Sequence, residues 1–193
     1  PYNMVDECHP SDNHYNCPVV ASYAENIRAN MDILQEKNIE LIQPFLPLND
    51  KKRMIERLTE ELVGEQLTKQ EIAPAVEAAY IELEHYKKDV RNYGMRILRR
   101  IENNHEPAIL LVGRPYHIDP EINHGIPEMI QSYGLPVLSE DVVYHLPVSG
   151  EKLEIVNQWS YHARLYHAAS YVAAHENLTL IQLSSFGCGL DAI

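Results

Sequence analysis

Pro107–Gly125 reads PAILLVGRPYHIDPEINHG, and this stretch decides the fold that we expect for the chain. It begins with a run of apolar residues, Ala108–Val112, which a glycine ends. A short, wholly apolar run between turn residues is typical of a strand buried on both faces, in the centre of a parallel sheet. Because open α/β sheets bind ligands at the carboxyl ends of such strands, the polar loop that follows is the first candidate site. Its candidate residues are Arg114, Tyr116, His117 and His124.

The segments after this loop continue an alternation of helix and strand. The pattern predicts a helix over Asn123–Tyr133, ended by Gly134 as its cap, and then a strand over Leu135–Ser139. A further helix is expected over Asn157–His175, and a further buried strand over Leu178–Leu183. Strands joined by such compact connections form parallel units. We therefore predict an α/β fold with a three-layer, Rossmann-like parallel sheet.

The first part of the chain shows weaker signals. Residues 1–16 look irregular, and residues 17–193 are expected to form a single α/β domain fragment. Asn38–Leu48 alternates loosely between apolar and polar residues and ends in prolines, which predicts an edge strand.

Two helices should follow this segment. Lys51–Val63 is expected to be helical, with Asp50 as its cap. Thr68–Asn104 is the longest helical pattern, and Thr68 with Glu71 forms a capping box at its start. Together they predict a helical insertion over about residues 51–104, a long helical arm on the α/β domain.

Composition limits the classes of partner. The chain has 193 residues, 45% of them hydrophobic, which suffices for one full core. The net charge is −12, and we expect no nucleic-acid partner because non-specific binding of nucleic acid needs a basic face. No apolar stretch approaches the roughly 20 residues that span a bilayer, so no membrane partner is expected. The first residue is not Met and the last residues stop in a loop, so we expect a piece of a longer protein.

The cysteines point to two kinds of chemistry. Cys8, Cys17 and Cys188 form an odd, sparse set, which argues against a disulfide framework and for a reducing, cytoplasmic compartment. Cys17 lies directly before a proline that fits the first turn of a helix, and a helix N-terminus favours a thiolate. Cys188 lies between two glycines, in the loop after the last expected strand.

Parallel strands open their carboxyl ends on one edge, so this loop and the loop after Val112 should share a rim. With Cys8 or a histidine of the rim as a further ligand, Cys17 and Cys188 would suit an iron–sulfur cluster or a zinc ion. Free structural thiols explain the same residues, since the chain has no CxxC motif.

Other motifs are absent or weak. The sequence has no Walker A loop, no GxGxxG after a strand, no GxSxG and no HExxH. Arg114 and backbone N–H groups could bind phosphate, or Arg114 could pair with a neighbouring acid. His162 and His167 are five residues apart and do not form an i, i+4 metal pair, so they are interpreted as packed core histidines.

Three stretches together resemble one family. They are Asn16–Ile27 (NCPVVASYAENI), Val112–Pro127 (VGRPYHIDPEINHGIP), and a pair within Asn157–Ala192 (NQWSYHARLYHAASYVA and LIQLSSFGCGLDA). They resemble the C-terminal region of bacterial and archaeal CoA-substrate-specific enzyme activases, which are related to the 2-hydroxyacyl-CoA dehydratase system.

This resemblance implies a redox role. Cys17 and Cys188 match the family's expected ligand cysteines for a 4Fe–4S cluster, whereas Cys8 falls in a variable stretch. Arg114, Tyr116, His117 and His124 would then support the cluster or bind substrate. ATP would bind only to an actin-like N-terminal part that is not in this chain, and a further family cysteine would lie before residue 1.

The implied function is to help hold a cluster for ATP-driven, low-potential electron transfer toward an acyl-CoA dehydratase-type reaction. The partners would be the rest of its own longer chain and an acyl-CoA dehydratase or an acyl-CoA substrate. The isolated piece is expected to be inactive. Two alternatives stay open: a non-catalytic docking or regulatory domain with structural cysteines, and a zinc-binding domain.

Overall fold

The computed structural model of the protein describes residues 11–62, 67–148, 156–185 and 187. Its contacts divide the chain into two compact units, and the division falls between Glu84 and His85. The unit that begins at His85 contains the sheet, whereas Asn13–Glu84 is helical and irregular. Each unit is described by itself below.

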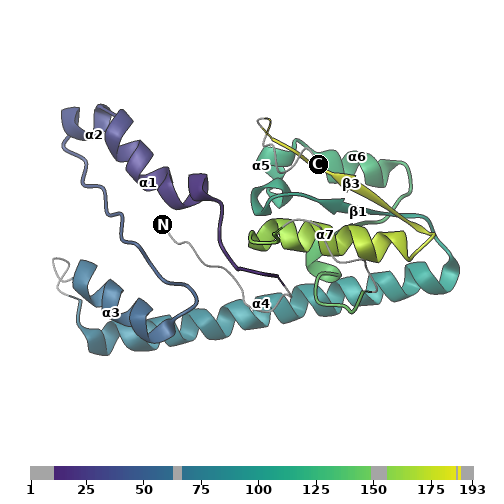
Figure 1. Cartoon of the computed structure of the whole chain (residues 1–193), viewed down its shortest axis with the longest axis horizontal. Helices are drawn as coiled ribbons and strands as arrows, with labels where there is room; N and C mark the ends of the chain where they lie inside the picture. Colours follow the sequence, from purple (N-terminus) through teal and green to yellow (C-terminus); the bar gives the residue numbers. More distant parts are fainter. Residues whose placement is uncertain (1–10, 63–66, 149–155, 186, 188–193) are drawn as a thin grey trace. The chain divides into compact units, whose positions relative to one another are not determined.

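The sheet of the second unit is parallel and has β1 (Ala108–Val112) at its centre (Figure 1). Within the described residues, β1 pairs with β2 (Val137–Ser139) on one side and with β3 (Leu178–Gln182) on the other. Every residue of β1 is buried. The prediction of a central, fully buried parallel strand is confirmed, because an apolar side chain at every position suits a strand that is covered on both faces.

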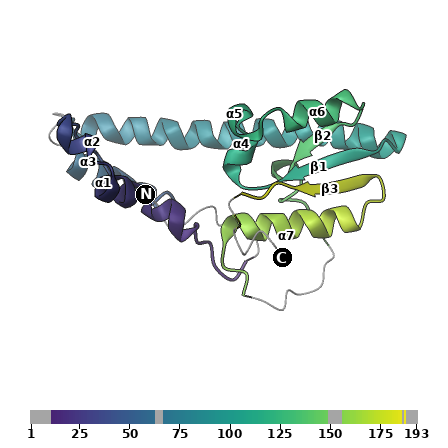
Figure 2. The same cartoon turned by 90° about the horizontal axis from the view of Figure 1, so that it is seen from above.

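Helices cover both faces of this sheet (Figure 2). On one face α6 (Ile126–Ser132) packs through Ile130 against Ile109 and Leu111 of β1. The opposite face carries α7 (Ser160–Ala173) and the C-terminal part of α4 (Lys69–Asn104). The predicted three-layer, Rossmann-like α/β fold is thus confirmed.

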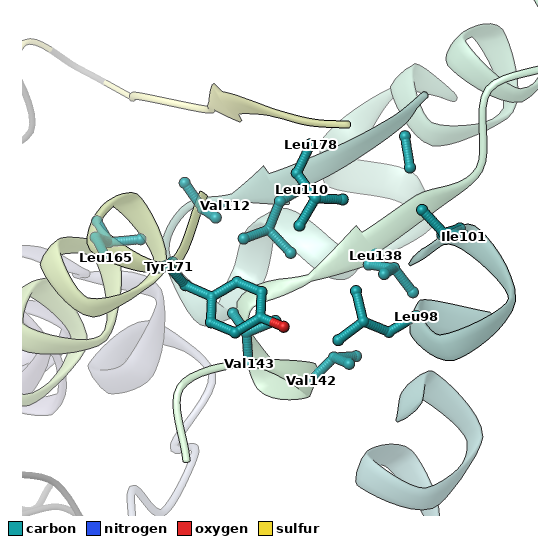
Figure 3. Packing of buried hydrophobic residues seen from close by; sticks show 12 residues of the cluster. Leu98, Ile101, Leu110, Val112, Leu138, Val142, Val143, Leu165, Tyr171 and Leu178 are labelled. Carbon is teal, nitrogen blue, oxygen red and sulfur yellow. The ribbon is translucent and has the colours of Figure 1, made fainter. Parts of the chain in front are cut away.

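The main core lies between the sheet and the α4–α7 layer. Leu110 and Val112 of β1 meet Leu98 and Ile101 of α4, together with side chains of α7 (Figure 3). Leu98, Ile101 and Leu110 are fully buried. Burial of one such side chain stabilises the fold by about 1.5–3 kcal/mol, so this layer fixes the position of the sheet and of its carboxyl edge.

The connection between β1 and β2 differs in part from the prediction. The chain passes through η2 (Pro115–Ile118) and α5 (Pro120–Asn123) before α6. The expected helix over Asn123–Tyr133 is therefore split, because His124 and Gly125 both adopt left-handed backbone conformations. The side chain of Asn123 accepts a hydrogen bond from the Gly125 N–H (3.0 Å), which holds this break. Gly134, at φ 78°, ends α6 as predicted.

The first unit contains α1 (Pro18–Asn30), α2 (Ile33–Glu36), α3 (Lys51–Glu61) and the first part of α4. Its small core is built from Met54, Ile72 and Val76. The two predicted caps are confirmed. The Asp50 side chain accepts from the Arg53 N–H (2.9 Å). The carboxylate of Glu71 accepts from the N–H and the hydroxyl of Thr68.

The predicted edge strand over Asn38–Leu48 was wrong. This segment is irregular, and the described part of its unit holds no strand with which it could pair. Pro44 and Pro47 remove two backbone donors. The loose alternation of its apolar residues therefore does not lead to a ladder of hydrogen bonds.

Gly94 gives a test of how α4 packs on the second unit. A Cβ at Gly94 would lie 2.2 Å from Cγ2 of Val142, so only glycine allows this approach. Alanine favours a helix by about 1 kcal/mol over glycine. We nevertheless expect Gly94→Ala to lower the free energy of unfolding by about 1–2 kcal/mol, because overpacking costs more than the propensity gains. Denaturant unfolding measures the change.

The matched control is Val142→Ala, alone and combined with Gly94→Ala. In the double variant the cost should be clearly smaller than the sum of the two single costs, since the clashing methyl groups are gone. Additive costs would contradict the contact.

Candidate functional site

The carboxyl end of β1 is built around a close contact between its backbone and His117. A Cβ at Gly113 would lie 2.4 Å from Nδ1 of His117, so a glycine is required there. The N–H of Arg114 donates to His117 Nδ1 (2.8 Å). The imidazole of His117 thereby caps the end of the strand from within η2, and it is buried.

His117 also connects two loops that are far apart in sequence. Its Nε2 lies 2.8 Å from Oγ of Ser185, which follows β3. The N–H of Leu183 donates to the carbonyl of Val112 (2.8 Å), so β3 stays paired with β1 up to its carboxyl end. The prediction that the loops after β1 and β3 open on one edge is confirmed by these contacts.

Arg114 contacts an imidazole of α7. Its Nη2 lies 2.6 Å and its Nη1 lies 3.2 Å from the two ring nitrogens of His162, and both residues are buried. A guanidinium only donates hydrogen bonds, so the nitrogen at 2.6 Å accepts and must be unprotonated. Sequence reasoning left the partner of Arg114 open between a phosphate and an acid, and it did not select His162.

His167 is a packed core histidine, as the sequence predicted. It is buried in α7, and burial lowers the pKa of His167 against hydrogen bonds at Leu146 and Val143 that raise it. His162 is buried as well, but its contact with Arg114 gives it a place at the site.

Glu140 is a titratable group that sequence reasoning missed. It is buried in η3 (Glu140–Val142), directly after β2. Burial raises the pKa of Glu140 to about 7, and Asp141 adds to the increase. Arg164 opposes the shift only in part, because its guanidinium pairs with Asp141 and stays 3.9 Å from Glu140 Oε1. An acid directly after an apolar strand was the available signal.

A small cavity lies at this carboxyl edge, with a volume of about 140 Å³. Its polar lining residues include Arg114, His117, Gln131, Ser139 and Glu140. Its apolar lining comes mainly from the strands and α6. The cavity lies where the α/β architecture places ligand sites.

The other two candidates of the loop differ from each other. Tyr116 is half-buried and its ring lies 4.5 Å from that of His117, in a tilted arrangement. His124 is exposed at the end of α5 and does not line the cavity. The structure therefore brings Arg114, Tyr116 and His117 together and leaves His124 outside.

The cysteines are only partly covered by the structure. Cys17 is at the start of α1, directly before Pro18, as predicted. Its thiol is free and partly exposed, and its N–H donates to Oδ1 of Asn16 (2.9 Å). Cys8 and Cys188 lie outside the described residues. Within the residues that were described, no three His, Cys, Asp or Glu side chains are placed to hold a metal ion.

Comparison with known families identifies the chain. The profile of a family described as CoA enzyme activase uncharacterised domain (DUF2229) matches residues 2–143. The chain belongs to this family. The match includes Cys17, Arg114, His117 and Glu140, and it ends before α7 and β3. No curated protein and no solved structure shows a significant match to this CoA enzyme activase domain.

The helices were also compared with the requirements for crossing a bilayer. In the part of the CoA enzyme activase domain that the structure describes, no helix combines the necessary length with the necessary apolar character.

Glu140 gives a pH-dependent prediction. The folded protein holds the Glu140 proton more tightly than an unfolded chain does, because its pKa is about 7 against an ordinary value of 4.5. The stability that this proton contributes is full below about pH 4.5 and is lost as the pH rises through about 7. Relative to Glu140→Gln, the wild type should lose roughly 3 kcal/mol of unfolding free energy over this range.

The measurement is the free energy of unfolding from pH 4.5 to 8 for the wild type and Glu140→Gln. Glu121→Gln is the matched control, since Glu121 is exposed and the same change should leave the pH profile intact. A difference between wild type and Glu140→Gln that does not change with pH would contradict the assignment.

Proposed function

We propose that this CoA enzyme activase domain helps to hold a 4Fe–4S cluster for low-potential electron transfer. The observation that carries the proposal is the fixed carboxyl edge of the sheet. There, Ser185 is held by His117, and Gly187 adopts a left-handed backbone conformation at φ 62°, directly before Cys188 in the sequence.

Cys17 fits a cluster ligand in its own right. Its thiol is free, partly exposed and located at the start of a helix whose N-terminal dipole favours the thiolate form. Thiolates are the ligands that iron–sulfur clusters need. Reduced thiols persist in the cytosol, which is where we expect the protein to act.

When bound, the cluster would accept and release single electrons. The residues of this domain would supply thiolate ligands, exclude water and donate hydrogen bonds at the edge of the sheet. Arg114, His117 and Tyr116 would hold this edge, and the cavity beside them would admit part of a substrate. ATP hydrolysis belongs, by the resemblance, to an actin-like part outside this chain. The partners would be the rest of that protein and an acyl-CoA dehydratase or acyl-CoA substrate.

Anaerobic reconstitution with iron and sulfide tests this function in the intact protein that carries the domain. We expect bound iron, acid-labile sulfide and an EPR signal after reduction. Cys17→Ala and Cys188→Ala should each abolish the signal, because each removes a thiolate ligand. Cys8→Ala is the matched control and should leave the iron content unchanged.

Two outcomes would contradict the proposal. Bound zinc without sulfide would make this a zinc-binding domain. Absence of any metal from the anaerobic protein, or a cluster that survives both ligand substitutions, would leave a docking or regulatory domain with structural cysteines.

A further inference from the structure

The hydrogen bonds of His117 determine where its proton lies. A backbone N–H can only donate, so the bond from Arg114 N–H requires an unprotonated Nδ1. Arg114 N cannot turn away, because it follows the end of β1 and the close contact at Gly113. While this bond exists, His117 is neutral and its ring proton is on Nε2.

The position of this proton sets the role of Ser185. Nε2–H must donate to Ser185 Oγ across the 2.8 Å contact, so the hydroxyl oxygen acts as the acceptor. The hydroxyl proton of Ser185 is therefore available for another acceptor. Among the residues that the structure describes, no second contact of Ser185 Oγ is found.

We propose that His117 is a positioning residue that directs the Ser185 hydroxyl proton toward an electron-rich sulfur of a ligand bound at the carboxyl edge of the sheet. This inference rests on the proposed function, since the acceptor is a sulfur of the cluster or of its thiolate ligand. Hydrogen bonds to such sulfurs raise the reduction potential of a cluster. The pair His117–Ser185 would thus tune the potential without contacting the iron.

The neighbouring serine provides the natural control. Ser184 is exposed, whereas Ser185 is half-buried and in contact with His117. The two positions have the same side chain and are adjacent in sequence, so only the directed hydroxyl distinguishes them.

The first arm of the test needs no cluster. Long-range ¹H–¹⁵N spectra of the imidazole-labelled protein report which ring nitrogen of each histidine is protonated, and His117→Gln identifies the signal. We expect a neutral His117 with the proton on Nε2. The Nδ1–H tautomer, or an imidazolium at neutral pH, would overturn the inference even if the protein binds a cluster.

The second arm measures the midpoint reduction potential of the reconstituted intact protein. Ser185→Ala should lower the potential because the donor is lost, Ser185→Thr should restore it, and Ser184→Ala should leave it unchanged. His117→Asn, which keeps an acceptor near Nδ1 but has no donor near Nε2, should lower it as Ser185→Ala does. His117→Gln, which keeps a donor near Nε2, should lower it less.

The outcomes separate the two proposals. A normal cluster whose potential is the same in Ser185→Ala and in the parent would overturn this inference and leave the proposed function intact. A parent that binds neither iron nor sulfide would overturn the proposed function, and with it the acceptor named here. Thermal unfolding of each variant identifies those that fail to fold, and the Ser185→Thr variant then decides.

Discussion

The site depends on one constraint: β1 is buried on both faces, and its backbone must find hydrogen-bond partners in the protein along its whole length. Parallel neighbours satisfy the strand itself. At its carboxyl end the sheet pattern stops, and His117 accepts from the N–H of Arg114 in place of a strand. The ring that completes the strand is therefore also the ring that contacts Ser185, so the local satisfaction of one backbone group fixes the geometry of two loops.

The same edge collects the buried polar groups of the second unit. Arg114, His117, His162 and Glu140 are all buried, although the domain has a net charge of −12 and ample surface for polar side chains. A charged group loses hydration on burial, which is costly unless the protein supplies partners. Arg114 has His162, whereas Glu140 is left with a raised pKa. Buried groups with shifted proton affinities are concentrated at functional sites, which agrees with a ligand site at this edge.

Local sequence patterns predicted the features that depend on neighbours in sequence. The apolar run of β1, the Asp50 cap and the position of Cys17 before a helix are of this kind. The split between α5 and α6 was missed because it depends on two left-handed residues and an Asn123 bond. The contacts of Arg114 with His162 and of His117 with Ser185 join residues 48 and 68 positions apart, and no local pattern reports them. The strand expected over Asn38–Leu48 failed for the complementary reason, since alternation without a partner strand does not make a sheet.

Membership of the CoA enzyme activase family, the confirmed parallel sheet and the joined loops at its carboxyl edge support one account, in which the domain presents thiolates to an iron–sulfur cluster. The most direct test is the ⁵⁷Fe Mössbauer spectrum of the intact protein, produced in iron-57 and purified without oxygen or reconstitution. The account predicts the quadrupole doublet of an oxidised 4Fe–4S cluster, which disappears in Cys188→Ser. A protein that contains no iron, or a doublet that is identical in Cys188→Ser, would contradict it.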